Sequence, residues 1–569
     1  MAQIDNSFLE RNSPSLASRL AFMALILAAL YLSYFHNLGA IGLVGPDEPR
    51  YAWIARDMME TGDWVTPRLY GKPWFEKPVL YYWGAALSFK LFGVNEAAAR
   101  FPSAASALLA TLALAWLAGR LYGAETARWL LLLLPTTVGM IGFSHAASTD
   151  MPFSAMLTIA MVSAAFVLGL VRDEYTPILP RTPWLALVLL GFFLGLAVLA
   201  KGPAAIVLSS GALLPWAILS KRWRDAFRCL HPVAITSFCL TALPWYLLCA
   251  RRNPDFFRVF IIEHNFKRYL TPEFQHIQPF WFYLPVTLLA VFPWTILLVP
   301  ASKQALRVIR GRHPERDSTL FLLCWVAFPL VFFSVSKSKL PGYILPAIPP
   351  LVLLLAASLG SRLRPAEKPA RWLVAALGAG LLGLAIAVYA FSGKWTAPSG
   401  ILPLRDVRFL AFMAAFAGVA VIVLALLRGA RVALFALVFF LLLLLVKTGD
   451  LLGKLDAALT ARSALSEASR NWPEFSPRAA ATWGLTRSEA YQLNFYTHSV
   501  LPEWQPGDPK PSWLFLNPRE RPQLDTSSFE CLAYRIYPAV IPCRNTASVG
   551  GLGVLGGSRD DRVRDGQPR

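Results

Sequence analysis

Long apolar runs recur along most of this chain of 569 residues, and they constrain its fold more than any other feature. A helix needs about 20 apolar residues to cross the hydrocarbon core of a bilayer. Inside that core every backbone polar group must be bonded within the chain, so recurring runs of this length predict a bundle of membrane-spanning helices. We count about 13 such runs, near residues 18–39, 98–119, 124–144, 151–171, 184–200, 203–220, 231–250, 280–301, 318–336, 343–360, 372–392, 407–427 and 432–449.

The charge content agrees with a bilayer as the solvent for most of the chain. Only 15% of the residues are charged, whereas a soluble protein carries roughly 25%. The formal net charge of +20 would by itself suggest a nucleic-acid partner. Most of the cations, however, lie in short segments between apolar runs, and no basic domain with interleaved aromatic residues stands apart from them. We therefore expect no nucleic-acid partner.

The positions of Lys and Arg predict the orientation of the spans. A polar leader with Arg11 and Arg19 precedes the first run, and no small-residue cleavage site follows it, so we expect an uncleaved span with a cytoplasmic N-terminus. Later loops at 221–228, 303–316 and 362–371 are rich in cations, as the positive-inside rule requires of cytoplasmic loops. An odd number of spans then places the C-terminal region outside.

Two features of the expected external loops need a further explanation. The first loop, 40–97, is too long for a simple connector, and its pattern predicts one helix opened by Pro49 and a second, apolar helix over 79–92 that lies on the membrane surface. The loops at 251–279 and 336–342 carry several Lys and Arg residues, against the topological bias. An anionic partner at that face would account for them.

The composition changes near Asp450, where the membrane domain of residues 1–450 ends. We expect a small α/β domain over 451–546, followed by a disordered tail over 547–569 that is rich in Gly, Arg and Asp. Cys531 and Cys543 form the only cysteine pair in this polar region, and they would be able to form a disulfide if the region is outside the cytoplasm.

Acidic residues stand at two places where apolar runs meet the external face. Asp47 and Glu48 fall at the start of the helix opened by Pro49, where the helix dipole favours ionised carboxylates. Asp150 follows Ser-Thr at the boundary between two apolar runs. Each of the three has a simpler alternative role as a helix cap, most of all Glu48. The functional interpretation is that they face a substrate.

Cations stand in four further segments on the same expected face. The first three also have a plain structural interpretation, as an interfacial anchor, a snorkelling side chain or a solvated loop face. The segments are Trp74–Pro78 with Glu76 and Lys77, Lys201–Pro203, Glu263–Tyr269 with His264 and Arg268, and Lys337–Tyr343 with Lys339.

The topology places all of these motifs on one side of the membrane, where they would line one cavity. Phosphate is bound by Arg and Lys, an acceptor hydroxyl needs a carboxylate to take its proton, and a lipid carrier needs an apolar groove. The sequence contains neither a Walker-type loop nor a Rossmann glycine fingerprint, so a soluble nucleotide donor is not supported.

In combination and in order, these motifs resemble a known family. The pattern Asp47-Glu48-Pro-Arg50-Tyr51, Phe75-Glu76-Lys77-Pro78, Ser148-Thr149-Asp150, Ala200-Lys201-Gly202-Pro203, Glu263-His264 with Arg268, and Lys339-Leu-Pro-Gly-Tyr343 is similar to that of the bacterial aminoarabinose transferases that modify lipid A. These belong to the GT-C class of glycosyltransferases, with the protein O-mannosyltransferases. The resemblance covers residues 20–360, and the C-terminal domain matches less well.

The resemblance implies an all-α polytopic enzyme of the GT-C type in the bacterial inner membrane, with a small periplasmic α/β domain. Its donor would be a sugar linked to undecaprenyl phosphate, and its acceptor a lipid or glycan of the cell envelope such as lipid A. Asp47, Asp150 and Glu76 would be catalytic. The carrier phosphate would be held by Arg50, Lys77, Arg268 and Tyr343, with Lys201 and Lys339 as weaker candidates. Glu48, Tyr51 and His264 would contact substrate.

The expected reaction is a single displacement at the anomeric carbon with inversion. Asp47 would act as general base for a hydroxyl acceptor, or would orient the sugar if the acceptor is a phosphate. No cofactor is required by this scheme, although Asp47 and Glu76 offer ligands for a divalent cation. A flippase for a lipid-linked sugar, a protein glycosyltransferase of the same class, and a structural membrane protein are the alternatives.

Overall fold

The computed structural model describes residues 16–171, 184–260, 277–363, 369–396, 403–525, 527–533 and 538–546. The chain divides into two compact units. Among these described residues, the helical unit contains those within 16–41, 50–396 and 403–454, and the second unit contains those within 42–49 and 455–546. The predictions for Arg268, His264 and the tail 547–569 fall outside the described residues.

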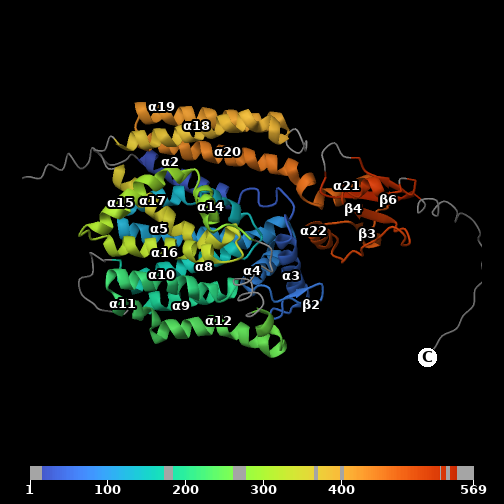
Figure 1. Ribbon diagram of the computed structural model, residues 1–569, viewed down its shortest axis with the longest axis horizontal. Helices are drawn as coiled ribbons and strands as arrows, with labels where there is room; N and C mark the ends of the chain where they lie inside the picture. The colour runs from blue at the N-terminus through green and yellow to red at the C-terminus, as the bar shows by residue number, and fades with distance from the viewer. Residues whose placement is uncertain are drawn as a thin grey trace, which may run out of the picture. The chain divides into compact units, whose positions relative to one another are not determined.

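Ten helices in the described part of the chain are long and apolar enough to cross a membrane. They are α2 (Leu16–Tyr34), α5 (Glu96–Tyr122), α8 (Asp150–Val167), α9 (Trp184–Lys201), α12 (Pro232–Arg252), α16 (Arg316–Val335), η5 (Pro341–Ala347) continued by α17 (Ile348–Arg362), α18 (Pro369–Thr396), α19 (Leu404–Leu427) and α20 (Ala430–Leu459). The expected polytopic helical fold is confirmed, and Figure 1 shows these helices running roughly parallel within the helical unit.

Two further spans are broken, and one is short. The chain bends by 60° between α6 (Ala124–Leu133) and α7 (Val138–Ser144), and by 108° between α14 (Tyr283–Ala290), preceded by η3 (Phe280–Phe282), and α15 (Leu298–Arg310), preceded by η4 (Trp294–Leu297). The apolar helix α10 (Ala204–Ser220) has 17 residues. With these three, every one of the expected runs has a helical counterpart.

The two broken spans meet at their breaks. Each break contains a proline, Pro135 or Pro293, which cannot donate a backbone hydrogen bond. The amide of Val138 donates to the carbonyl of Phe292 at 3.0 Å, and Trp294 Nε1 donates to Thr136 Oγ1 at 3.0 Å. Polar groups freed by one break are therefore satisfied by the other, as irregular backbone at membrane depth requires.

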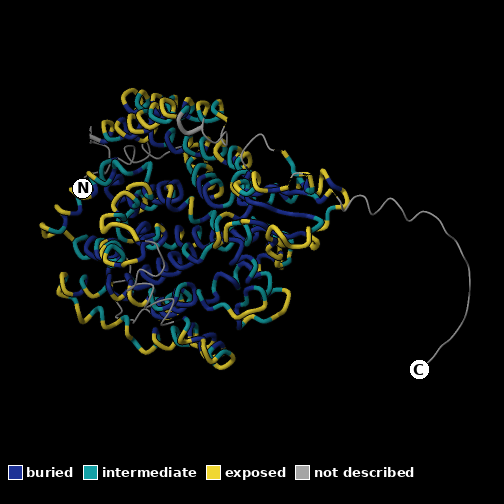
Figure 2. Tube along the Cα trace, turned by 45° about the vertical axis from the view of Figure 1, so that its right-hand side comes forward, coloured by how far each residue is buried: buried dark blue, intermediate teal, exposed yellow. Residues whose placement is uncertain are grey.

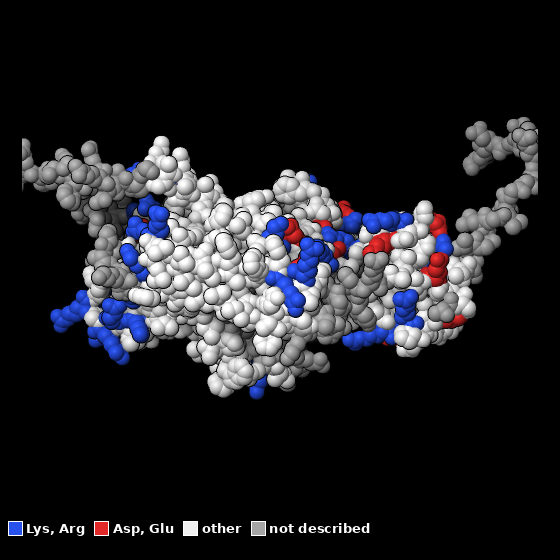
Figure 3. Space-filling model, turned by 90° about the horizontal axis from the view of Figure 1, so that it is seen from above, with Lys and Arg blue, Asp and Glu red and all other residues white. Residues whose placement is uncertain are grey.

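Burial separates central from peripheral helices. Nearly every residue of α8 is buried, and α17 is buried along most of its length, so these two helices form the core of the unit. In Figure 1, α18 and α19 lie along one edge of the bundle and α9 and α12 along the opposite edge. Figure 2 shows these outer helices with exposed faces around a buried interior. Figure 3 shows a broad zone of the bundle surface without charged side chains, which suits contact with lipid.

The segment after the first span is folded. It contains α3 (Asp47–Thr61), the short hairpin β1 (Arg68–Leu69) and β2 (Lys72–Pro73), and the apolar helix α4 (Leu80–Phe92). Both helices expected in this segment are present, although α3 begins two residues before Pro49, which the first helical turn tolerates. The ring of Tyr51 packs 5.8 Å from that of Tyr82 and thereby joins α3 to α4. The helical unit also contains the short α11 (Trp223–Phe227) and η1 (Arg228–Leu230).

The second unit contains a four-stranded mixed sheet in the order β3-β4-β6-β5. Its strands are β3 (Ala480–Trp483), β4 (Trp513–Leu516), β5 (Phe529–Cys531) and β6 (Ile541–Asn545), and its helices are α21 (Arg462–Asn471), α22 (Arg487–Thr497), η6 (Pro477–Ala479) and η7 (Arg521–Gln523). β3 and β4 are parallel, and the other pairs are antiparallel. Apolar clusters around Trp513 and around Trp483 cover the two faces, which explains why β3 and β4 are buried along their whole length without alternation.

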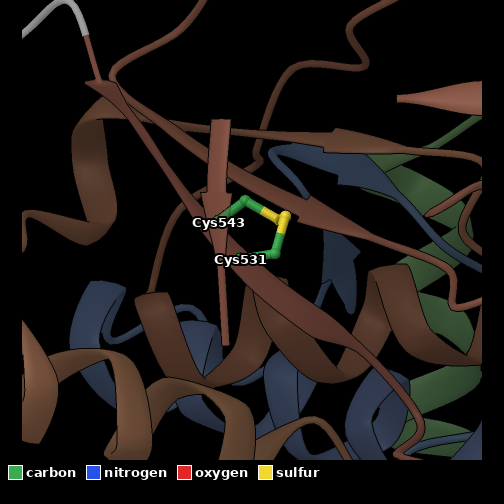
Figure 4. Close-up of a disulfide and its surroundings, with 2 residues drawn as sticks. All are labelled: Cys531 and Cys543. Carbon is green, nitrogen blue, oxygen red and sulfur yellow. A yellow bond between two sulfur atoms is a disulfide. The ribbon is translucent and has the colours of Figure 1, made fainter. Parts of the chain in front are cut away.

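A disulfide joins Cys531 to Cys543 (Figure 4). The two residues are directly opposite each other on β5 and β6, with their Cα atoms 4.0 Å apart. The pairing considered from the sequence is therefore present in the structure.

Candidate active site

Asp47 and Glu48 begin α3, but their side chains lie in different environments. Asp47 is exposed, whereas Glu48 is buried, and its Oε2 accepts a hydrogen bond of 2.7 Å from the amide of Val44. One carboxylate oxygen of Glu48 is thus used to fix the preceding backbone, which favours its structural interpretation. Asp47 remains the acidic group of this motif that faces outward, at the positive end of a helix dipole.

The first cationic cluster is built around Glu76. Its Oε2 lies 3.0 Å from Arg50 Nη2, and its Oε1 lies 3.4 Å from Lys77 Nζ. Arg50 is buried, and its guanidinium lies over the rings of Tyr51 at 5.2 Å and Trp74 at 5.4 Å. Two cations thus converge on one carboxylate in a poorly solvated place. Such a cluster is suited to binding an anion.

The second cluster joins the start of α8 to the end of α9. Asp150 and Lys201 form an ion pair, and each complements the dipole of its own helix. The ammonium of Lys201 also lies 4.9 Å from the ring centroid of Tyr343. The basic partner considered for Asp150 is therefore Lys201, and Lys201 has an acidic partner that competes with any phosphate.

Gly342 permits the close approach of η5 to this ion pair. A Cβ placed on Gly342 would lie 2.9 Å from Asp150 Cγ and 2.9 Å from a ring carbon of Phe143. The backbone of Gly342 thus packs directly against the carboxylate, and the adjacent Tyr343 reaches Lys201. Sequence reasoning selected Tyr343 but missed the steric requirement at Gly342.

Lys339 is buried and joins the segment before η3 to the segment before η5. Its Nζ donates to the carbonyl of Ser336 at 2.6 Å and to that of Gln278 at 3.1 Å. Burial lowers the pKa of Lys339, and the charge of Lys337 adds to that effect. These carbonyl contacts support a structural part for Lys339 in holding the loop that precedes η5.

Packed aromatic side chains connect the two clusters. Phe75, next to Glu76, lies 5.2 Å from the ring of Phe256, which lies 6.0 Å from that of Tyr246. Tyr246 Oη donates at 3.0 Å to the carbonyl of Val198, one turn before Lys201. Motifs far apart in sequence are therefore joined within one region of the helical unit. The stacked rings of Phe256 and Phe260 have centroids 5.6 Å apart. These residues were not selected from the sequence, although their spacing of one helical turn was a signal that they lie side by side.

A polar pocket of about 460 Å³ adjoins the Glu76 cluster. Glu76 and Trp74 line it on one side, and Arg252 and Arg258 on the other. Arg252 pairs with Asp63 at 3.0 Å. Arg252 and Arg258 belong to the loop whose cations the positive-inside rule does not explain, and both border this pocket. They were not selected from the sequence as site residues.

An apolar groove of about 990 Å³ lies elsewhere on the helical unit. Its walls come from η3 with α14 and from α16, and exposed side chains such as Phe280 and Val335 border it. Ser336, Lys337 and Lys339 form its polar end. The groove therefore combines an apolar trough with cations at one end.

The described residues contain no cluster of three or more side chains that are typical metal ligands. No group of three or more His, Cys, Asp or Glu side chains in that part of the chain is arranged to hold a metal. Both oxygens of Glu76 face protein cations, which a metal would have to displace. Metal binding by Asp47 and Glu76 stays a prediction, and no step is assigned to a metal.

Comparison with known proteins agrees with this fold and these motifs. Residues 19–260 match the family model described as dolichyl-phosphate-mannose-protein mannosyltransferase. The structure is similar to that of ArnT from Cupriavidus metallidurans bound to undecaprenyl phosphate, with a TM-score of 0.73, 22% sequence identity, and coverage of 96% of this chain and 100% of that chain. The chain is thus a multi-pass membrane protein that shares the fold of that structure.

Two curated relatives are undecaprenyl phosphate-alpha-4-amino-4-deoxy-L-arabinose arabinosyl transferases. The protein from Edwardsiella ictaluri is 37% identical over 332 residues, 58% of each chain. The protein from Pseudomonas aeruginosa strain UCBPP-PA14 is 35% identical over 377 residues, 66% of this chain and 65% of the relative. The chain thus matches about three fifths of the length of such relatives, 58% in the first case. The chain is thus similar both to these transferases and to the protein mannosyltransferase family model, in agreement with the resemblance drawn from its motifs.

Proposed function

We propose that this protein is a glycosyltransferase that uses a polyprenyl-phosphate-linked sugar, and that it transfers aminoarabinose from undecaprenyl phosphate to lipid A. The observation that carries the proposal is the cluster in which the buried Arg50 and the half-buried Lys77 converge on the carboxylate of Glu76. The names of the relatives supply the particular sugar donor. The choice of lipid A as acceptor rests on the motif resemblance.

Arg50 and Lys77 would hold the carrier phosphate. In the displacement, an acceptor oxygen forms a bond to the anomeric carbon while the bond from that carbon to the phosphate oxygen breaks. The electron pair goes to the phosphate, which leaves as polyprenyl phosphate with increased negative charge. Fixed cations that already face this position stabilise that charge without reorganisation. Tyr343, Arg268 and Lys201 stay proposed as further phosphate contacts.

Asp47 would act at the acceptor. With a hydroxyl acceptor, its carboxylate would take the proton as the new bond forms. With a phosphate acceptor, no strong base is needed, and Asp47 would orient the sugar. Its exposed position at the start of α3 supports either role. Glu76 would shape the sugar site through its two cations, and Tyr51 and His264 stay proposed as substrate contacts.

The apolar groove between α14 and α16 is our candidate for the prenyl tail of the carrier. Its apolar walls suit a hydrocarbon chain. We also propose that the N-terminus is cytoplasmic and that the second unit lies in the periplasm of a bacterium. The disulfide in that unit supports this placement, since disulfides persist outside the reducing cytosol.

The test is a transfer assay with purified protein in liposomes. A radiolabelled polyprenyl-phosphate sugar is supplied with lipid A, and in a second arm with a peptide acceptor. We expect label on lipid A with the wild type and loss of at least 100-fold in rate, on the order of a removed general base, for Asp47→Asn. Glu60→Gln on the same helix is the matched control, because Glu60 pairs with Arg56 and should leave the rate unchanged.

Each other result has a definite meaning. Label on the peptide alone would replace lipid A by a protein acceptor. Movement of the labelled lipid between leaflets without transfer would favour a flippase. Full activity of Asp47→Asn would remove Asp47 from the mechanism.

A further inference from the structure

The segment that leads into Asp47 is held by the C-terminal part of the chain. Residues 42–49 belong to the second unit together with residues from 455 onward. The backbone amide of Gly42 donates to Asp456 Oδ1 at 2.7 Å, and that of Leu43 donates to Tyr496 Oη at 2.8 Å. The next amide, of Val44, donates to Glu48 Oε2 at 2.7 Å. Three consecutive amides therefore end on side-chain oxygens.

Asp456 is itself fixed in this arrangement. It is buried, and its Oδ1 also accepts from Thr460 Oγ1 at 2.7 Å, while its Oδ2 pairs with Arg462 Nε at 2.9 Å. A buried carboxylate with several hydrogen bonds and a cation partner has little freedom to move. It is thus a rigid acceptor for the amide of Gly42.

The contact also leaves no room for a side chain at residue 42. A Cβ on Gly42 would lie 2.6 Å from Thr460 Oγ1 and 2.9 Å from Tyr496 Oη. Gly42 and Leu43 are both buried. The backbone is therefore held by shape as well as by hydrogen bonds, only a few residues before the exposed carboxylate of Asp47.

We propose that Asp456 and Tyr496 are positioning residues for the acidic motif, so that the C-terminal domain sets the place of Asp47 at the start of α3. This inference rests on the proposed function. The hydrogen bonds of the amides of residues 42–44 fix the segment that leads into the helix, and Glu48 links that segment to the helix itself. Small displacements of a reacting group reduce rates strongly, so a domain remote in sequence controls catalysis through this segment.

The test compares Tyr496→Phe with Tyr491→Phe. The first change removes the acceptor of the Leu43 amide but keeps the ring, and the second removes a hydroxyl of the same helix that accepts from Arg487. We expect kcat to fall about 10-fold in Tyr496→Phe, with KM for the donor lipid within about twofold of wild type. Hydrogen exchange at the amides of residues 42–44 should become faster. Tyr491→Phe should change none of these.

A second variant, Gly42→Ala, should lower kcat in the same way by steric displacement. The inference is overturned if Tyr496→Phe exchanges faster at these amides yet keeps its wild-type kcat. It is also overturned if the fall in kcat only matches the fraction of the variant that is unfolded in the assay, because such a loss would be purely structural. If the wild type transfers no sugar, the proposed function fails, and this inference fails with it.

Discussion

At the scale of single residues, the site depends on which partner each charge has. The sequence predicts that Asp47, Arg50, Glu76 and Lys77 are functional, and the structure unites the last three in one cluster. It could not predict that Glu76 would take two cations, because that depends on tertiary contacts between α3 and a loop. Nor could it predict that the ammonium group of Lys339 would donate hydrogen bonds to two backbone carbonyls.

Replacement of Arg50 by Lys should weaken carrier binding. Lys offers a point charge where Arg offers a planar fork that also stacks on Trp74 and Tyr51. We expect the Kd for polyprenyl phosphate in nanodiscs to rise about 10-fold, equivalent to ~1.4 kcal/mol. Arg56→Lys, on the exposed face of the same helix, is the control and should leave the Kd unchanged. An unchanged Kd in Arg50→Lys would exclude Arg50 from the phosphate site.

The Asp150–Lys201 pair should show strong coupling. Removal of one charge leaves its partner in a poorly solvated place, whereas removal of both does not. Asp150→Asn and Lys201→Met should each lower the melting temperature in detergent, and the double variant should recover part of that loss, with a coupling of about 1–3 kcal/mol. Strictly additive losses would show that the two charges do not depend on each other.

At the scale of elements, the apolar runs were sufficient to locate the spans, because length and composition decide whether a helix can cross a bilayer. They could not locate the contact between the two breaks, where Val138 meets Phe292, since it joins segments far apart in sequence. The helices of the first external loop were predictable from periodicity. The approach of η5 to α8 was not, because it depends on the missing side chain of Gly342.

Gly342→Ala should therefore displace η5. The added methyl group would enter the space of the Asp150 carboxylate, and the contact of Tyr343 with Lys201 would shift with it. We expect kcat to fall by about 10-fold or more. Gly383→Ala in α18 meets no atom within 4 Å and should behave as wild type. Equal rates for the two variants would show that η5 tolerates the displacement.

At the scale of the whole molecule, a polytopic bundle is joined in sequence to a small sheet domain closed by one disulfide. The class of this domain was predictable from its short apolar strands. The inclusion of residues 42–49 in this domain was not predictable, because Gly42 and its hydrogen-bond partner Asp456 are 414 residues apart in the sequence.

Loss of the disulfide should destabilise the second unit. The bridge closes a loop of sequence separation 12, for which chain entropy alone gives about 3 kcal/mol. We expect Cys531→Ser with Cys543→Ser to lower the melting temperature of the purified protein, measured by calorimetry. Cys324→Ser, at a free cysteine of the helical unit, is the control for the loss of a thiol. An unchanged melting temperature in the double variant would show that the bridge is not a stabilising element.

The central claim is that the Arg50–Glu76–Lys77 cluster binds the phosphate of the carrier. The most direct measurement is a cryo-EM structure of the protein in nanodiscs with polyprenyl phosphate. The phosphate oxygens should lie about 3 Å from the nitrogens of Arg50 and Lys77, with the prenyl chain leading into the groove between α14 and α16. A phosphate bound away from both cations would contradict the account.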